Sequence, residues 1–219
     1  GHLDQSVPGL GEDEIGRLAA SFERMRRSLK SRLDEMALLL SASQRLASSY
    51  DLERVLPPIL EGVRELTQSD QVRLVLVADS LGWSSGTLFA SGGDPGGWAG
   101  LDPAILELCR QRGRFVLENP ARARALLDLG SLSAPLEGLL ALPLRSEDVF
   151  VGCLWVGYLR PHVFSPDATN LLSILAGQLG VSVANARLFL QAQVERSRLS
   201  SILETTPDGV ILLDAHGLV

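Results

Sequence analysis

The chain has 219 residues, of which 46% are apolar and 21% charged, and its formal net charge is −6. This composition is typical of a globular protein and excludes a disordered or collagen-like chain. Because the basic residues are spread along the sequence and do not gather on one predicted face, we expect no nucleic-acid partner.

The cysteine content and the hydrophobic runs indicate the compartment. Cys109 and Cys153 are too few for a disulfide framework and fit a reducing environment. No stretch approaches the roughly 18 consecutive apolar residues of a membrane span, and the N-terminus has no secretory signal. The sequence predicts a cytoplasmic segment that does not itself cross a membrane.

The first predicted element is a long helix from Gly11 to about Tyr50. Its apolar residues recur at alternating steps of three and four, as in a heptad seam. They are Ile15, Leu18, Phe22, Met25, Leu29, Met36, Leu39 and Leu46. Arg32 and Ser43 occupy core positions, so the seam is imperfect towards its middle. This narrow stripe favours pairing with a second chain; the alternative is an amphipathic helix packed on its own domain.

The central part of the chain predicts short helices and strands. Asp51 can cap a helix that runs to about Thr67, and Pro57-Pro58 either opens that helix at its first turn or kinks it. After this helix, the sequence predicts strands at 72–78 and 87–91, a glycine-rich loop at 92–100, a helix at 102–112, a strand at 115–118 and a helix at 121–129. Gly113 is expected to end the helix at 102–112.

The last predicted elements are two strands and a second long helix. The strands cover 139–144 and 149–159, and the second is apolar on both faces, as a central strand should be. Asp167 is expected to cap the helix. The apolar positions of this helix step by three and four at Leu172, Ala176, Leu179, Val183, Ala186 and Leu190. The order of elements predicts an α+β fold, an antiparallel sheet with flanking helices and long coiled-coil helices at both ends.

Residues 13–25, DEIGRLAASFERM, closely resemble the second helix of a HAMP domain. Glu14, Ile15 and Gly16, followed by Leu18, Phe22 and Met25, reproduce the motif of that family in order and spacing. The resemblance implies a relay module placed just inside the membrane of a bacterial receptor, with its first helix missing from this chain. The full-length protein is therefore expected to be an inner-membrane receptor.

The middle of the chain resembles a GAF domain. Residues 139–159, LLALPLRSEDVFVGCLWVGYL, are similar to the paired central strands of the family, and residues 171–189, LLSILAGQLGVSVANARLF, are similar to its last helix. Residues 202–217, ILETTPDGVILLDAHG, resemble the start of a PAS domain. The resulting division is 1–36 for the HAMP-like half, 37–192 for the GAF-like domain and 193–219 for a linker helix with a truncated PAS-like start.

This order of modules resembles the input half of a sensor histidine kinase in a two-component system; a receptor with another output, such as a diguanylate cyclase, is the alternative. The chain itself is expected to have no catalytic residue. His2 is terminal, and His162 and His216 lie in predicted turns, so no histidine suits phosphorylation on a paired helix. No Gly-Lys pair exists, which excludes a P-loop.

The residues that some GAF domains use to bind cyclic nucleotides or bilins are not recognisable in this sequence. The only lysine, Lys30, lies outside the GAF-like part, which argues against the lysine-containing cyclic-nucleotide signature of that family. Cys109 is followed by Arg110 and Cys153 lies in a predicted core strand, which argues against bilin attachment. Neither cysteine has metal-ligand spacing to His162. We expect no metal and no fixed cofactor.

Two kinds of site residue follow from this interpretation. An unknown small molecule could occupy a pocket near Trp98, Cys109, Phe115 and Trp155, whose alternative role is ordinary core packing. The chain is expected to form a parallel homodimer. The predicted interface residues are Ile15, Leu18, Phe22, Met25, Leu29, Met36, Leu179, Val183, Ala186 and Leu190.

Overall fold

The computed structural model describes residues 14–48, 51–77, 88–93, 95–130 and 136–205. Its centre is a five-stranded sheet in the order β2-β1-β5-β4-β3, in which every neighbouring pair is antiparallel. The strands are β1 (Gln71–Leu76), β2 (Leu88–Gly92), β3 (Phe115–Leu117), β4 (Gly138–Ser146) and β5 (Val149–Tyr158). The predicted α+β class with an antiparallel sheet is confirmed.

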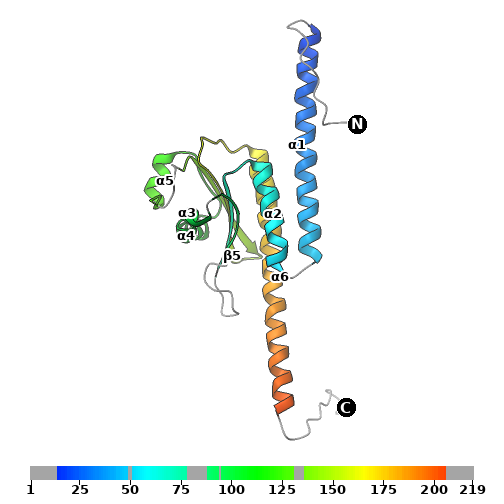
Figure 1. Cartoon of the computed structure of the whole chain (residues 1–219), viewed down its shortest axis with the longest axis vertical. Helices are drawn as coiled ribbons and strands as arrows, with labels where there is room; N and C mark the ends of the chain where they lie inside the picture. The colour runs from blue at the N-terminus through cyan, green and yellow to red at the C-terminus, as the bar shows by residue number, and fades with distance from the viewer. Residues whose placement is uncertain (1–13, 49–50, 78–87, 94, 131–135, 206–219) are drawn as a thin grey trace.

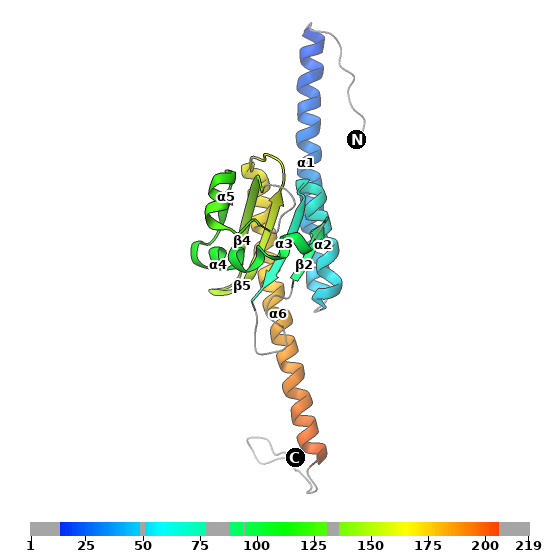
Figure 2. The same cartoon turned by 60° about the vertical axis from the view of Figure 1, so that its left-hand side comes forward.

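Helices cover both faces of the sheet. On one face lie three long helices, and on the other three short ones (Figure 1; Figure 2). The long helices are α1 (Glu14–Ser48), α2 (Leu52–Thr67) and α6 (Pro166–Thr205), and the short ones are α3 (Pro95–Ala99), α4 (Asp102–Arg112) and α5 (Pro120–Leu126). Helix α3 lies in the segment predicted as a glycine-rich loop.

The two faces of the sheet carry separate cores because side chains alternate along each strand. On β1, Leu74 packs towards the long helices, whereas Val75 packs towards the short ones. Strand β5 is buried from Val151 to Tyr158 on both faces, as its apolar sequence predicted. The sheet is thus the middle layer of a three-layer domain.

Helix α2 begins as predicted. Asp51 adopts an extended conformation, and its carboxylate accepts a hydrogen bond from Arg54 N. Pro57 and Pro58 lie inside the helix, which corrects the idea that they open its first turn. Both prolines are exposed, and the buried face of α2 is built from Leu56, Ile59, Leu60 and Val63, among others.

The start of α6 differs from the prediction by two residues. Pro166 is the first helical residue, and the Ser165 hydroxyl accepts a hydrogen bond from Ala168 N at 3.1 Å. Asp167, the predicted cap, lies within the first turn, where its negative charge is attracted by the positive end of the helix dipole. Proline prefers the first helical position, which explains the shift.

Helix α6 is long and apolar enough, by composition, to cross a membrane. In this protein its apolar residues have another role, because Leu172, Leu175 and Leu179 are buried in the core between the sheet and the long helices. Gly180 permits this approach: a Cβ atom there would lie 2.4 Å from the carbonyl oxygen of Arg145 on β4. The first half of α6 is therefore a core helix.

Candidate functional site

The face of the sheet covered by α3, α4 and α5 contains a buried charged network. Arg73 projects from β1 and is 0% exposed, and Asp102 at the start of α4 is 8% exposed. Arg73 donates from Nε to Asp102 Oδ1 at 3.0 Å and from Nη2 to Asp102 Oδ2 at 2.6 Å. Two parallel hydrogen bonds fix a guanidinium and a carboxylate in one plane, so this pair holds α4 in register on the sheet.

Trp155 on β5 completes the network. Its indole Nε1 donates to Asp102 Oδ1 at 3.0 Å, and the Arg73 guanidinium carbon lies 5.8 Å from the centre of its ring. Gln71 extends the network towards β2: with its amide oxygen oriented towards Arg73, that oxygen accepts from Arg73 Nη1 at 3.1 Å and the amide nitrogen donates to Ser91 O at 3.2 Å. The buried charges are thus matched by hydrogen bonds on several sides, which offsets their desolvation.

The structure brings together the residues predicted to line a ligand pocket. Trp98, Cys109 and Trp155 belong to one buried cluster, and Phe115 packs against it while partly exposed. The Trp98 and Trp155 ring centres are 5.9 Å apart. Gly157 makes room for this pair, since a Cβ atom there would meet Trp98 Cζ3 at 2.5 Å. This density of contacts supports the core-packing role that the sequence left open.

The two cysteines meet in the same cluster. Cys109 on α4 and Cys153 on β5 are both fully buried. A hydrogen bond with the Cys109 thiol, and then burial, raise the pKa of Cys153 well above its usual range. Because the thiolate is the reactive form, Cys153 is held as a neutral thiol in this core.

Arg73 and Asp102 were not among the residues singled out from the sequence. The sequence does contain an indication of Arg73, because all the other residues of the predicted strand 72–78 are apolar. A guanidinium that is buried in such a strand requires an acidic partner. The partner could not be chosen from the sequence, because Asp102 is 29 residues away in the chain and becomes adjacent only when α4 docks.

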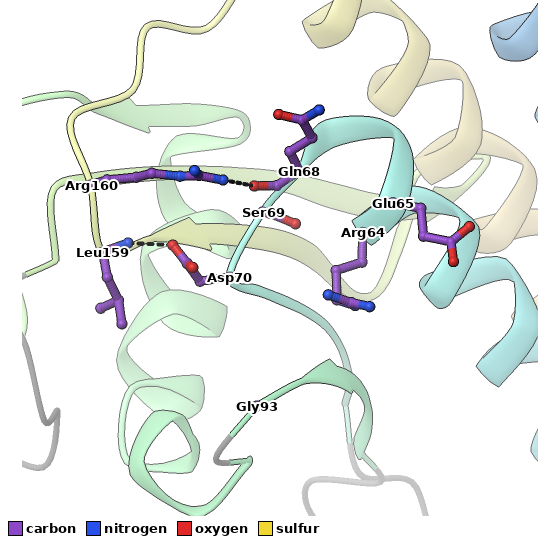
Figure 3. Close-up of a pocket in the computed structure, with 8 residues that line it drawn as sticks. All are labelled: Arg64, Glu65, Gln68, Ser69, Asp70, Gly93, Leu159 and Arg160. Carbon is purple, nitrogen blue, oxygen red and sulfur yellow. Dashed lines mark hydrogen bonds between the residues drawn. The ribbon is translucent and has the colours of Figure 1, made fainter.

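A surface cavity of about 680 Å³ lies where α2 ends and β1 begins (Figure 3). Arg64 on its rim is paired with Glu61 at 2.5 Å, and Arg160 donates to Gln68 O at 2.9 Å. Asp70 accepts from Leu159 N at 2.7 Å. The hydrogen bonds of Arg160 and Asp70 join the end of β5 to the α2–β1 connection. These polar atoms therefore stabilise the local structure.

Between Leu18 and Met36, helix α1 carries an exposed apolar stripe. Leu18 is 62% exposed, Met25 65% and Met36 63%, with Phe22 and Leu29 also exposed between them. Further along the helix, Ala42 is fully buried, and Leu38, Leu39 and Leu46 pack against the core. Helix α1 therefore packs on the domain core through its second half, from about Leu38 onward. The side chain of Ile15 lies outside the described part of the structure.

The predicted interface on α6 needs correction. Leu179, Val183 and Ala186 are buried in the core of their own domain, at 1% exposure or less, so a second chain does not contact them. Their three-and-four stepping reflects packing on the sheet and on α2. Leu190, at 39% exposure, lies beyond the core and stays a candidate. Among the side chains that the structure describes up to residue 201, the exposed large apolar residues of α6 are Ile174, Val181, Leu188, Phe189, Leu190, Val194 and Leu199.

Known proteins of the same fold are readily found among solved structures. The GAF domain of an Acinetobacter phosphoenolpyruvate-protein phosphotransferase is 20% identical, with a TM-score of 0.57 over 70% of this chain and 94% of that one. The GAF domain of a candidate sensor histidine kinase from Pseudomonas syringae pv. tomato is 23% identical, with a TM-score of 0.55 over 78% and 97%. Free methionine-R-sulfoxide reductase from Neisseria meningitidis is 16% identical, with a TM-score of 0.53 over 73% and 93%.

No curated protein matches the sequence. Two family profiles do, the HAMP domain at residues 1–31 and the GAF domain at residues 49–184. The HAMP-like and GAF-like resemblances are thereby confirmed, whereas the PAS-like start stays a prediction, since residues 206–219 lie outside the described part. With the GAF profile covering more than half of its length, the chain belongs to the GAF domain family and is, together with its HAMP segment, a sensing and relay region of a signalling protein.

Proposed function

We propose that this chain is the cytoplasmic sensory and relay region of a sensor histidine kinase, acting as a parallel homodimer. In this proposal the HAMP segment receives a movement from a membrane-spanning receptor part. Helix α1 transmits the movement to the GAF domain, and α6 carries it towards a catalytic output. The chain relays the signal and performs no catalysis itself.

The arrangement of the long helices supports a relay. Helices α1 and α6 run in the same direction and leave the domain at opposite ends, so the start of α1 and the end of α6 lie far apart (Figure 1; Figure 2). Between these ends, α1 contacts both α2 and α6. Leu38 of α1 lies so close to α2 that a Cβ atom on Gly62 would meet its Cδ1 at 2.8 Å. A shift of α1 would therefore be felt directly by α2 and α6.

The observation that carries the dimer is the exposed stripe of α1. Leu18, Phe22, Met25 and Leu29 follow one another at steps of four, three and four, the spacing of a coiled-coil seam. About half or more of each side chain is exposed to solvent in one chain. A second copy in parallel would cover this stripe with its own, and like residues would meet at each level.

Two observations favour a kinase as the output of this relay. The fold is shared with the GAF domain of the Pseudomonas syringae candidate sensor histidine kinase, and a HAMP segment precedes the GAF domain here. A HAMP segment is expected directly after a membrane span. The combination favours a membrane receptor whose helices end in a kinase.

Dimerisation is tested by measuring the solution mass of the 219-residue chain with multi-angle light scattering. The wild type should have twice the chain mass, and the Phe22→Glu/Met25→Glu variant should shift to the monomer, because four carboxylates would meet in the seam. The Ala20→Glu/Arg27→Gln variant makes the same change of net charge on the opposite face of α1 and should stay dimeric. A monomeric wild type at high concentration would contradict the proposal.

A further inference from the structure

A second cavity, of about 330 Å³, lies beneath α1 and is separate from the buried charged network. Helix α1 contributes Ser31 and Glu35 to its lining, and the first turn of α6 contributes Asp167. The end of α2, Tyr158 of β5 and the loop that follows β5 form the rest. The volume is within the range of small-molecule sites, about 300 to 1,000 Å³. One chain supplies every wall, so the cavity does not depend on the proposed dimer.

Three aromatic rings form one side of this cavity. His162 stacks on Tyr158 with ring centres 3.7 Å apart and an interplanar angle of 5°. Phe164 meets both rings edge-on, at 5.6 Å from Tyr158 and 4.9 Å from His162. The Tyr158 hydroxyl donates to Thr67 O at 3.0 Å, which fixes the position of the stack. The aromatic wall is therefore assembled before any ligand arrives.

The charged side chains that line the cavity are Glu35 and Asp167, and Arg32 of α1 lines the adjoining cavity, to which both carboxylates also contribute. Glu35 and Asp167 line it from opposite helices, and its described lining includes neither lysine nor arginine. The nearest arginine in the loop, Arg160, donates to Gln68 O and lines the neighbouring cavity (Figure 3). Burial, and then the charge of Arg160, lower the pKa of His162, although Glu118 opposes this. The lowered pKa favours the neutral form of His162, so the negative charge of this lining comes from Glu35 and Asp167.

We propose that this cavity binds a small organic ammonium cation. Faces of aromatic rings attract a cation through their quadrupole, and quaternary ammonium groups are recognised in this way. The carboxylates of Glu35 and Asp167 supply the counter-charge. Because Glu35 belongs to α1 and Asp167 to α6, the bound cation joins the input helix to the output helix at the place where α1 leaves the domain.

The experiment uses isothermal titration calorimetry of the 219-residue chain with choline at neutral pH and constant ionic strength. The neutral isostere of choline, in which a quaternary carbon replaces the nitrogen, is the matched probe. Choline should bind with one site per chain, and the isostere should bind at least about tenfold more weakly. Equal binding of the two probes, or no saturable binding of either choline or tetramethylammonium, would overturn the proposal.

Two variants place the binding in this cavity. Glu35→Gln and Asp167→Asn should each weaken choline binding by about threefold to tenfold, because each removes one nearby negative charge. Glu65→Gln removes an exposed carboxylate that lines the neighbouring cavity and should leave binding unchanged. Choline binding should also weaken as the pH is lowered and His162 gains a proton. If both Glu35→Gln and Asp167→Asn, folded by circular dichroism, bind choline like the wild type, the assignment is wrong.

Discussion

Arg73 in the middle of β1 and Asp102 at the start of α4 form a bidentate ion pair inside the domain. The pair joins two elements that are distant in the sequence and lies beside Trp155, the largest of the fully buried side chains. A charge removed from water is tolerated only when its partner stays in place. The pair is therefore the most sensitive point of the short-helix side of the sheet.

Replacing Asp102 by Ala should lower the free energy of unfolding by about 3–5 kcal/mol, because the change leaves the Arg73 charge buried without its main partner. Urea denaturation followed by circular dichroism measures the loss. The control is Glu107→Ala on the exposed side of the same helix, where the surface pair with Arg110 contributes at most about 1 kcal/mol. The Arg73→Leu/Asp102→Leu variant should lose less than Asp102→Ala alone. A loss under about 1 kcal/mol for Asp102→Ala would show that the pair is not buried in solution.

The two cysteines should be unreactive in the folded protein. The hydrogen bond with the Cys109 thiol, and then burial, raise the pKa of Cys153, so little of its thiolate is present at neutral or mildly alkaline pH; Cys109 is shielded by its burial. Treatment with iodoacetamide and mass spectrometry should find both cysteines unmodified in buffer and both modified in urea. Rapid modification in buffer would mean that α4 opens readily from the sheet.

Two glycines on α6 should respond to alanine in opposite directions. At Gly180 a Cβ atom would lie 2.4 Å from Arg145 O, so Gly180→Ala should destabilise the protein by about 1–3 kcal/mol. At Gly177 a Cβ atom meets nothing within 4 Å, so Gly177→Ala should raise stability by up to about 1 kcal/mol through helix propensity. Urea denaturation of both variants, at one protein concentration, measures the difference. Equal effects would contradict the close packing of α6 on β4.

Glu61 should titrate well below an ordinary glutamate. Hydrogen bonds from Arg64, and then from Ser91, lower its pKa from 4.5 to about 2. A lowered folded-state pKa means that the contribution to stability is present above pH 4.5 and disappears as the pH falls through about 2. The contribution is small, since 44% of the side chain is exposed.

Carbon-detected NMR titration of the Glu61 carboxyl group measures this pKa. In the Arg64→Gln variant the pKa should move back towards 4.5, because the largest cause of the shift is removed. An unshifted Glu61 in the wild type would show that the pair with Arg64 does not persist in solution.

Most elements could be predicted from local patterns. The helix at 102–112 and its end at Gly113 agree with the structure residue for residue. The cap at Asp51 and the central position of β5 also agree. These features depend on neighbouring residues, on hydrogen-bonding side chains and on glycine, whose effects act within a few positions of the chain.

The roles of the two long helices show where local pattern stops being informative. Both helices carry apolar residues at steps of three and four, and on that ground both were predicted to face a second chain. Met36 of α1 is exposed, whereas Leu179 of α6 is fully buried on the sheet. The same spacing faces a partner helix or a sheet equally well, because either surface covers one side of a helix.

The residue pattern alone therefore indicates the strands, most of the helices and the family of this protein, whereas α3 was missed. The partner of a buried charged side chain was decided only by docking in three dimensions, as for Arg73 with Asp102. The physical reason is that secondary structure follows from interactions within a few residues. The partner of a buried group, in contrast, is whichever residue the closed chain brings within a few ångströms.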